Sequence, residues 1–287
     1  MTEKKNLTPE LSSIIFLIGF AFYQITGLIL ATVMEVKSNA YIFVAYALPQ
    51  VAYIAVTLIT VKVCKVEFKL LPEKGSVSKA DYPLAVLLGL GIFFFALLPN
   101  FGVQKLIALL GKTPQVTLPD LTSPVSCVVA AIVICVLPAI GEELVFRKVF
   151  VDGFSKYGKI NAVIISGVLF GLSHLNLAQT IHQIFLGCIL SYLYVKTKNI
   201  TLTAIIHFIN NFLALFLTRF TGEEVWNNLV TLGICCAIGA VFIAINAIYL
   251  IKNKPKITND GREKPSTFAI GFFVFVAAMW VIAAVFS

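Results

Sequence analysis

Two adjacent glutamates within an apolar stretch are the first residues of this sequence whose type could do chemistry. Glu142 and Glu143 fall in residues 136–147, a segment that is otherwise apolar except for Arg147. A carboxylate in a membrane helix costs at least ~2.5–3.5 kcal/mol on insertion scales, so it marks a functional position by default. The other acidic residues can be assigned to loops or helix ends. All three histidines of the chain also fall in apolar stretches: His174, His182 and His207.

The spacing around the glutamates predicts which side chains can meet. Glu143 and Arg147 are four residues apart, so they share one face of a helix and can form an ion pair. Glu142 points about 100° away around the same helix and is free to face a cavity. The ion pair would explain Glu143 as a structural residue, but it leaves Glu142 unexplained.

Three further polar residues are predicted to lie at the depth of the glutamates. A turn near residues 157–159 is about equally far along the chain from the glutamates and from His174, so an antiparallel helical pair places them at similar depth. His207 and Asn211 are four residues apart and share a helix face. Each histidine taken alone is also explained as a hydrogen-bonded core residue. His182, which has no polar partner four residues on, is interpreted in that way.

Membrane-spanning helices are the elements that must hold these residues. The chain of 287 residues is 59% hydrophobic and 13% charged, with a mean hydropathy of +0.94. Soluble domains carry roughly 25% charged residues, and a soluble core of this size cannot hide so much apolar surface. No segment alternates polar and apolar residues as the strands of a transmembrane barrel do. The sequence therefore predicts an all-α, polytopic transmembrane helical bundle.

About nine apolar stretches define the predicted spans, and most are near the ~20 residues that a membrane-spanning helix needs. They lie near residues 12–34, 40–62, 82–99, 124–154, 160–177, 178–195, 200–219, 226–251 and 266–286. The third is expected to end at Pro99, with residues 101–110 along the interface, and the fourth is long enough to project into water. The whole chain, 1–287, is predicted to be a single membrane domain of about 8–9 spans, with its catalytic core near residues 124–215.

The distribution of basic residues predicts the orientation of the bundle. The net charge is +8, and most of the 22 Lys and Arg residues fall in alternate loops. Under the positive-inside rule, this asymmetry places the amino terminus and the loops with Lys69, Lys156, Lys198 and Lys254 in the cytoplasm. We expect a protein integral to the plasma membrane that contacts lipid and a membrane-associated peptide or protein, and no nucleic acid.

Three short motifs, in this order along the chain, carry a resemblance to a known family: Glu142-Glu143-x-x-x-Arg147, Phe170-x-x-x-His174 and His207-x-x-x-Asn211. They resemble those of the CPBP or Abi family, which comprises the type II CAAX prenyl proteases and bacterial relatives linked to bacteriocin self-immunity. The resemblance covers about residues 124–215, and the flanking spans carry no family signature.

The resemblance implies an intramembrane endopeptidase that cuts a membrane-associated peptide or a CAAX-like substrate. It implies that Glu142 and His174 activate a water molecule, with Glu142 as the general base. His207 and Asn211 would donate hydrogen bonds to the oxyanion of the tetrahedral intermediate. The implied supporting residues are Glu143, Arg147 and Phe170.

A metal is the alternative to this glutamate mechanism. Members of the family are often labelled metalloproteases, and a set of Glu142, His174 and His207 could bind zinc. The sequence has no H-E-x-x-H motif, however, and the three ligands would come from three separate helices. We therefore expect a metal-free mechanism, with zinc kept as the alternative.

Two other classes of protein are the rivals of an enzyme. In a proton-coupled transporter, Glu142 and His174 would form a proton relay. Such a protein is expected to show inverted repeats and paired broken helices, which we do not find in the sequence. A non-catalytic bacteriocin-immunity or scaffold protein would instead bind a membrane partner and keep its effect when Glu142 is lost.

Overall fold

The fold is helical throughout the part of the chain that the computed structural model describes. That part comprises residues 5–69, 77–112, 117–217, 221, 227–258, 261 and 263–286. Within it there is no strand, and an isolated bridge between Lys5 and Val66 is the only β-type pairing. The predicted all-α class is confirmed.

Nine helical segments account for the bundle within these described ranges. They are α1 (Pro9–Val33), α2 (Asn39–Val63), α3 (Asp81–Leu109), the central helix (residues 124–157), α7 (Lys159–Ser173), α8 (Leu177–Thr197), α9 (Ile200–Phe212) with η4 (Leu213–Leu217), α12 (Leu229–Asn253) and α13 (Thr267–Phe286). The central helix is one continuous rod built from α4 (Pro124–Ala130), η1 (Ala131–Val136), α5 (Leu137–Glu143), η2 (Leu144–Val151), α6 (Asp152–Phe154) and η3 (Ser155–Tyr157).

Each predicted apolar stretch corresponds to one of these segments, but the third differs in its end. α3 continues through Pro99 to Leu109, so the expected stop at Pro99 is wrong. Proline removes one backbone hydrogen bond, and a membrane helix tolerates that loss when neighbouring groups or local adjustments satisfy the freed carbonyl. Seven of the described segments are long and apolar enough to cross a membrane, which supports an integral membrane protein. α7 is shorter, and α8 is not among the seven.

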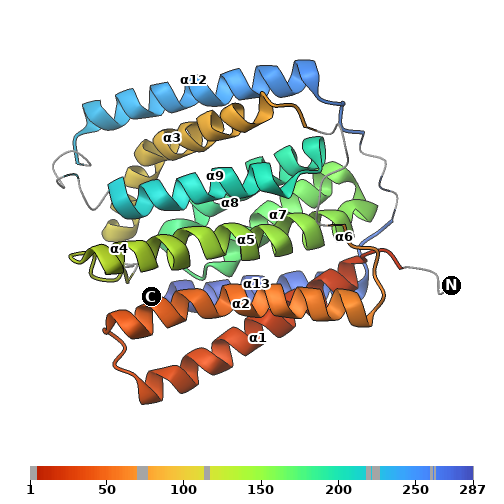
Figure 1. Cartoon of the computed structure of the whole chain (residues 1–287), viewed down its shortest axis with the longest axis horizontal. Helices are drawn as coiled ribbons and strands as arrows, with labels where there is room; N and C mark the ends of the chain where they lie inside the picture. The colour runs from red at the N-terminus through yellow and green to blue at the C-terminus, as the bar shows by residue number, and fades with distance from the viewer. Residues whose placement is uncertain are drawn as a thin grey trace.

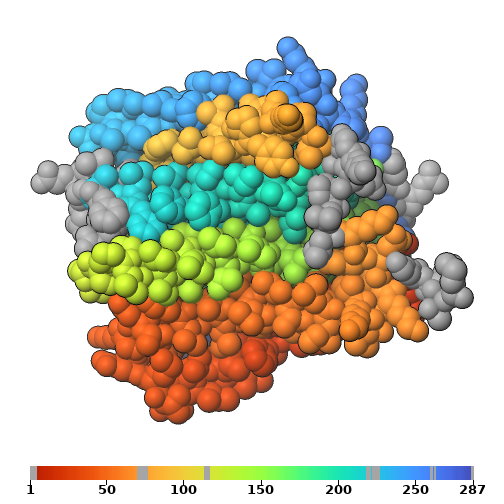
Figure 2. Space-filling view, in the orientation of Figure 1, coloured from red at the N-terminus to blue at the C-terminus, as the bar shows by residue number. Residues whose placement is uncertain are grey.

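The order of helices across the bundle places the central helix and α9 in its middle (Figure 1). α12 packs on α3, α3 on α9, α9 on α5 of the central helix, α5 on α2, and α2 on α1. α7 and α8 pack on each other, and α7 also contacts η2 and α13. Figure 2 shows α2, the central helix, α9 and α3 as adjacent bands on one face of the molecule. The glutamate-bearing helix is therefore flanked by protein rather than by lipid on both of these sides.

A cluster of aromatic rings fixes the part of the central helix that follows the glutamates. Phe16 of α1 packs against Phe146, Phe150 and Phe272 at ring-centroid distances of 6.0, 5.8 and 5.7 Å. All four rings are buried. Lipid tails are as apolar as phenylalanine, so close packing of this kind holds membrane helices together more than the hydrophobic effect does. The cluster thus sets how α1 and α13 dock on η2.

One end of the bundle collects the charged side chains of several loops. Three ion pairs join these loops: Lys254 with Asp81 at 2.6 Å, Lys198 with Asp152 at 2.7 Å, and Lys156 with Glu263 at 3.6 Å. At the opposite end, Asn39 hydrogen-bonds to the backbone of Asp120, and Lys112 donates to the carbonyl of Ala284. The loops that the basic residues predict to share one side of the membrane do lie at one end of the bundle.

The side of the membrane that each end faces is a testable prediction. Reporter fusions joined after Lys69 and after Lys112 should report opposite sides, with the Lys69 fusion in the cytoplasm. The positive-inside rule gives the sign, because Lys156, Lys198 and Lys254 lie at the same end as the amino terminus. Labelling of both fusions from the same side would contradict this topology.

Candidate active site

The two glutamates lie where the hydrogen-bond pattern of the central helix changes twice. η1 before them and η2 after them are π-helical, so α5 is a short α-helical stretch between two wider turns. Pro138 stands at the start of α5 and has no N–H to give to the helix. π-helical turns are rare and recur at functional sites. The local backbone therefore marks this position independently of the side chains.

Glu143 is fully buried and makes two charged or polar contacts. Its Oε2 lies 3.0 Å from Arg147 Nε, and both side chains are 0% exposed. Its Oε1 lies 2.8 Å from Nδ1 of His207, which donates a hydrogen bond to it across the interface with α9. The predicted ion pair between Glu143 and Arg147 is confirmed. The structure adds that the same carboxylate also holds His207.

The guanidinium of Arg147 has a second, aromatic neighbour. Among the described residues its nitrogens make no contact with full hydrogen-bond geometry, so the interaction with Glu143 is ionic. Its Cζ lies 4.7 Å from the centre of the Phe170 ring. A cation over a ring face is attracted by the ring quadrupole, more strongly when both are desolvated. Arg147 therefore ties the central helix to α7 as well as balancing Glu143.

His207 stands between the two glutamates. Because a carboxylate only accepts hydrogen bonds, the contact with Glu143 places a proton on Nδ1. Its Nε2 faces Glu142 Oε2 at 3.7 Å. The ring is 2% exposed. A neutral His207 would thus present a lone pair at Nε2, whereas the imidazolium, next to two carboxylates, would present an N–H.

Glu142 differs from its neighbour because only one of its oxygens is engaged. Its Oε1 accepts a hydrogen bond of 2.7 Å from Nε2 of Gln50 on α2. Its Oε2 is buried and has no hydrogen-bond partner among the described residues. The side chain as a whole is 14% exposed. Glu142 therefore contacts Gln50 of α2 and lies beside His207 of α9, with one oxygen that accepts no hydrogen bond from the described residues.

Phe170 brings the two catalytic histidine candidates to one place. Its ring centroid lies 4.9 Å from that of His174 and 5.6 Å from that of His207, edge-on in both cases. His174 Nδ1 donates to the carbonyl of Phe170 at 2.7 Å, because a carbonyl can only accept, and this leaves Nε2 as the basic nitrogen. Phe170 therefore contacts both histidines.

Comparison with known families reaches this same part of the chain. Residues 124–213 match the family described as type II CAAX prenyl endopeptidase Rce1-like. The resemblance predicted from the three motifs is confirmed over this segment, and the match supports a protease of the CAAX type. No curated protein and no solved structure matches the chain. α1, α2 and α3 lie outside the Rce1-like segment.

Asn211 lies in the Rce1-like segment, but its hydrogen bond goes to the backbone of the central helix and not to the other candidate residues. Its Nδ2 donates to the backbone carbonyl of Ile134 in η1 at 3.2 Å. No hydrogen bond within the described ranges joins it to Glu142, His174 or His207. The π-helical turn of η1 changes the normal helical pairing of its carbonyls, and Asn211 meets one of them. An amide has two N–H groups, so one donor is still unassigned.

The third histidine has a partner that its spacing on α8 did not reveal. His182 Nε2 lies 3.0 Å from Oδ1 of Asn210 on α9. This contact agrees with the interpretation of His182 as a hydrogen-bonded core residue. It also shows that the neighbouring residues Asn210 and Asn211 point to different helices.

The predicted zinc ligands do not form a ligand set in this arrangement. Of Glu142, His174 and His207, the first and last face each other at 3.7 Å. No group of three or more His, Cys, Asp or Glu side chains within the described ranges has the spacing of a metal site. One oxygen of Glu142 is engaged by Gln50, and Nδ1 of His207 is engaged by Glu143. We therefore assign no step to a metal.

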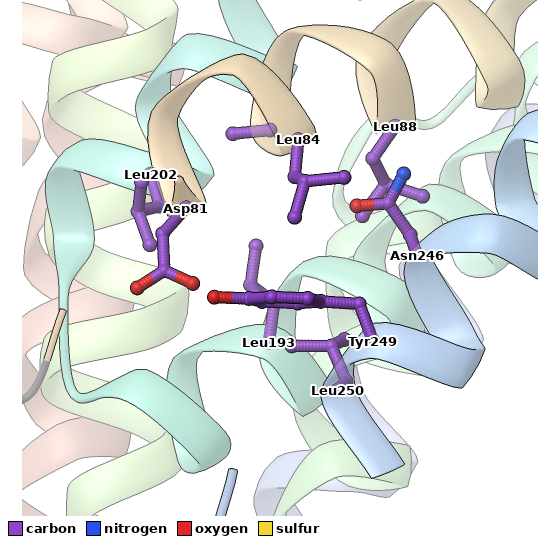
Figure 3. Close-up of a pocket in the computed structure, with 9 residues that line it drawn as sticks. Asp81, Leu84, Leu88, Leu193, Leu202, Asn246, Tyr249 and Leu250 are labelled. Carbon is purple, nitrogen blue, oxygen red and sulfur yellow. The ribbon is translucent and has the colours of Figure 1, made fainter. Parts of the chain in front are cut away.

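A small cavity near the charged end of the bundle is separate from this site (Figure 3). It measures about 10 Å³, roughly the room of one water molecule. Figure 3 shows the Tyr249 hydroxyl directed at the Asp81 carboxylate, with leucines around them. None of the Rce1-like motif residues lines the cavity. Residues of α3, α8, α9 and α12 line it.

Gln50 is the contact residue that the sequence interpretation missed. It lies on α2 directly after Pro49, far from the family motifs. The sequence held one signal, because Gln50 is the only amide side chain in the apolar stretch 40–62. Its partner, however, lies 92 residues further along the chain. No local spacing rule could have joined the two.

The two adjacent glutamates should respond differently to the same substitution. Glu143→Gln is expected to lower the free energy of unfolding by about 3–5 kcal/mol, because it leaves Arg147 buried without its counter-charge. Glu142→Gln should change stability little, since a glutamine oxygen can still accept the hydrogen bond from Gln50. Thermal unfolding of the purified proteins in detergent measures both. Equal stability of the two variants would show that Glu143 does not hold Arg147 in place.

Proposed function

We propose that this protein is an intramembrane endopeptidase of the CAAX type. It hydrolyses a peptide bond near the membrane-associated end of a peptide or CAAX-like substrate. The observation that carries the proposal is that the two adjacent carboxylates of the Rce1-like segment have different surroundings. Glu143 accepts a hydrogen bond from His207 at Oε1 and pairs with Arg147 through Oε2 at 3.0 Å. Glu142 Oε2 accepts no hydrogen bond from the described residues and lies 3.7 Å from Nε2 of His207.

Glu142 is the general base in this proposal, and His174 orients the water. The proton on His174 Nδ1 is held by the Phe170 carbonyl, so Nε2 can accept a hydrogen bond from the water. Glu142 Oε2 takes the proton as the water oxygen attacks the carbonyl carbon of the substrate. When the tetrahedral intermediate collapses, the same proton passes to the departing nitrogen. The products are a carboxylic acid and an amine.

His207 and Asn211 are the proposed donors to the oxyanion. With Nδ1–H held by Glu143, His207 can donate from Nε2 only as the imidazolium. Asn211 would use the N–H that does not bond to Ile134. Donors of this kind act where charge develops and are worth about 2.7–4 kcal/mol each.

A glutamine in place of Glu142 tests the proposed reaction, because it removes the basic carboxylate oxygen. Glu142→Gln should abolish cleavage, because an amide cannot take a proton from water, while its unfolding temperature stays near that of the wild type. The assay uses purified protein in liposomes and an internally quenched peptide that ends in a CAAX sequence, in prenylated and unprenylated forms. A zinc chelator should leave the wild-type rate unchanged.

Three outcomes of this assay would count against the proposal. Cleavage by Glu142→Gln at the wild-type rate would remove the general base. Loss of wild-type activity on chelation would assign the water to a metal. If the wild type cleaves no peptide but moves ions or solutes across the liposome membrane, and Glu142→Gln does not, the protein is a transporter.

Asn211→Ala should leave measurable activity, lower by roughly 10²–10³ in kcat if one oxyanion donor is lost. Asn210→Ala is the matched control, because it removes the neighbouring amide, whose partner is His182 and not the cluster. The measurement is kcat and KM of both variants on the same peptide. A larger loss of kcat for Asn210→Ala than for Asn211→Ala would show that Asn210, and not Asn211, is the oxyanion donor.

A further inference from the structure

Gln50 lies outside the Rce1-like segment, yet its side chain is hydrogen-bonded to the proposed general base. It is 5% exposed, and its Nε2 is 2.7 Å from Glu142 Oε1. We infer that Gln50 is a positioning residue of the proposed hydrolysis, which holds the carboxylate of Glu142 so that Oε2 faces the water. The inference rests on the proposed function.

The chemistry of the two groups fixes how the amide is oriented. An ionised carboxylate only accepts hydrogen bonds, so the NH₂ end of Gln50 must face Glu142. The last torsion of a glutamate side chain has a broad energy minimum and is not set by rotamer preference. With Oε1 held by Gln50, rotation of the carboxylate is restricted. Oε2 then stays near Nε2 of His207, from which it is 3.7 Å away.

The backbone on both sides of this hydrogen bond is held close. A Cβ added at Gly141 would lie 3.2 Å from Gln50 Cα and 3.2 Å from Gln50 O, so an alanine there would push α2 and α5 slightly apart. Tyr53, one turn after Gln50 on α2, is buried and stacks on Phe16 at 5.8 Å. α2 is therefore anchored at the turn that carries Gln50.

Gly141 also makes room for the amide itself. The Cβ of an alanine there would lie 2.7 Å from Gln50 Oε1, closer than such atoms normally come. That oxygen is buried and has no hydrogen-bond partner within the described ranges. Gly141→Ala is therefore a second way to disturb the contact, in which both Gln50 and Glu142 are kept.

A merely structural role for the hydrogen bond makes a different prediction from a positioning role. A structural contact between α2 and α5 affects stability and leaves the rate per folded molecule unchanged. A positioning contact affects kcat, because displacement of a catalytic group by about 1 Å can lower the rate by about 10²-fold. It leaves KM nearly unchanged, since Gln50 contacts the base and not the substrate.

The test compares variants of Gln50 with a matched control on the same helix face. Gln50→Met keeps the length of the side chain and removes the N–H. Gln50→His returns an N–H at a similar distance from Cα. Thr57→Val is the control, because Thr57 is a fully buried residue of α2 whose hydroxyl has no hydrogen-bond partner in the described part of the chain. All are assayed in liposomes with the CAAX-ending quenched peptide, beside wild type and Glu142→Gln.

We expect Gln50→Met and Gly141→Ala to lower kcat by about 10–10²-fold with KM unchanged. Gln50→His should recover part of the loss, and Thr57→Val should match wild type. In thermal unfolding, Gln50→Met and Glu142→Ala should be non-additive, because each variant alone removes the hydrogen bond between the two side chains. This measurement reports the contact without any assay of activity.

The outcomes separate this inference from the proposed function. Wild-type kcat for Gln50→Met, an effect on KM alone, or an equal loss for Thr57→Val would overturn the role of Gln50 while Glu142 stays the base. If the wild type does not cleave the peptide, or if Glu142→Gln still cleaves it, the proposed function fails and the role of Gln50 fails with it.

Discussion

The arrangement of the site depends on how a pair of adjacent carboxylates is accommodated inside an apolar bundle. Glu143 is fully buried, and its charge is balanced by Arg147 at 3.0 Å. A buried ion pair is rarely a net source of stability, because desolvation offsets the attraction, but removing one partner is strongly unfavourable. The pair therefore specifies one arrangement more than it stabilises the fold. His207 and Phe170 are both placed by it, the first through Glu143 and the second through Arg147.

The two adjacent glutamates have different surroundings. Glu143 has an oxygen on each of two cationic or donor partners and none to spare. Glu142, one residue earlier, accepts a hydrogen bond from Gln50 at one oxygen, and its other oxygen accepts none and lies 3.7 Å from His207. Neighbouring carboxyl groups whose environments are unlike can take up different roles in one reaction. The rotation of about 100° between successive helical residues is what separates the two environments.

The spacing of residues in the sequence was enough to predict the features that local helix geometry controls. The ion pair between Glu143 and Arg147 follows from four-residue spacing on a helix, and the apolar stretches follow from composition. Contacts that depend on the packing of distant segments were not predictable in this way. Gln50 meets Glu142 across 92 residues, and Asn211 turns to a carbonyl of a π-helical segment that no propensity rule forecasts. The predicted helix end at Pro99 was wrong because the surroundings of Pro99, and not the low helix propensity of proline, decide whether α3 continues.

The contact from α2 bears on what the Rce1-like segment can do alone. Residues 124–213 supply the glutamates, the histidines and Phe170, but the donor to Glu142 Oε1 comes from outside them. The hydrogen bond from Gln50 satisfies Oε1 of Glu142, so only Oε2 of this carboxylate is left without a donor among the described residues. Gly141 lies inside the segment and permits the close approach of α2, and Gln50 on α2 lies outside the segment. A helix outside the Rce1-like segment thus contacts the carboxylate that we propose as the general base.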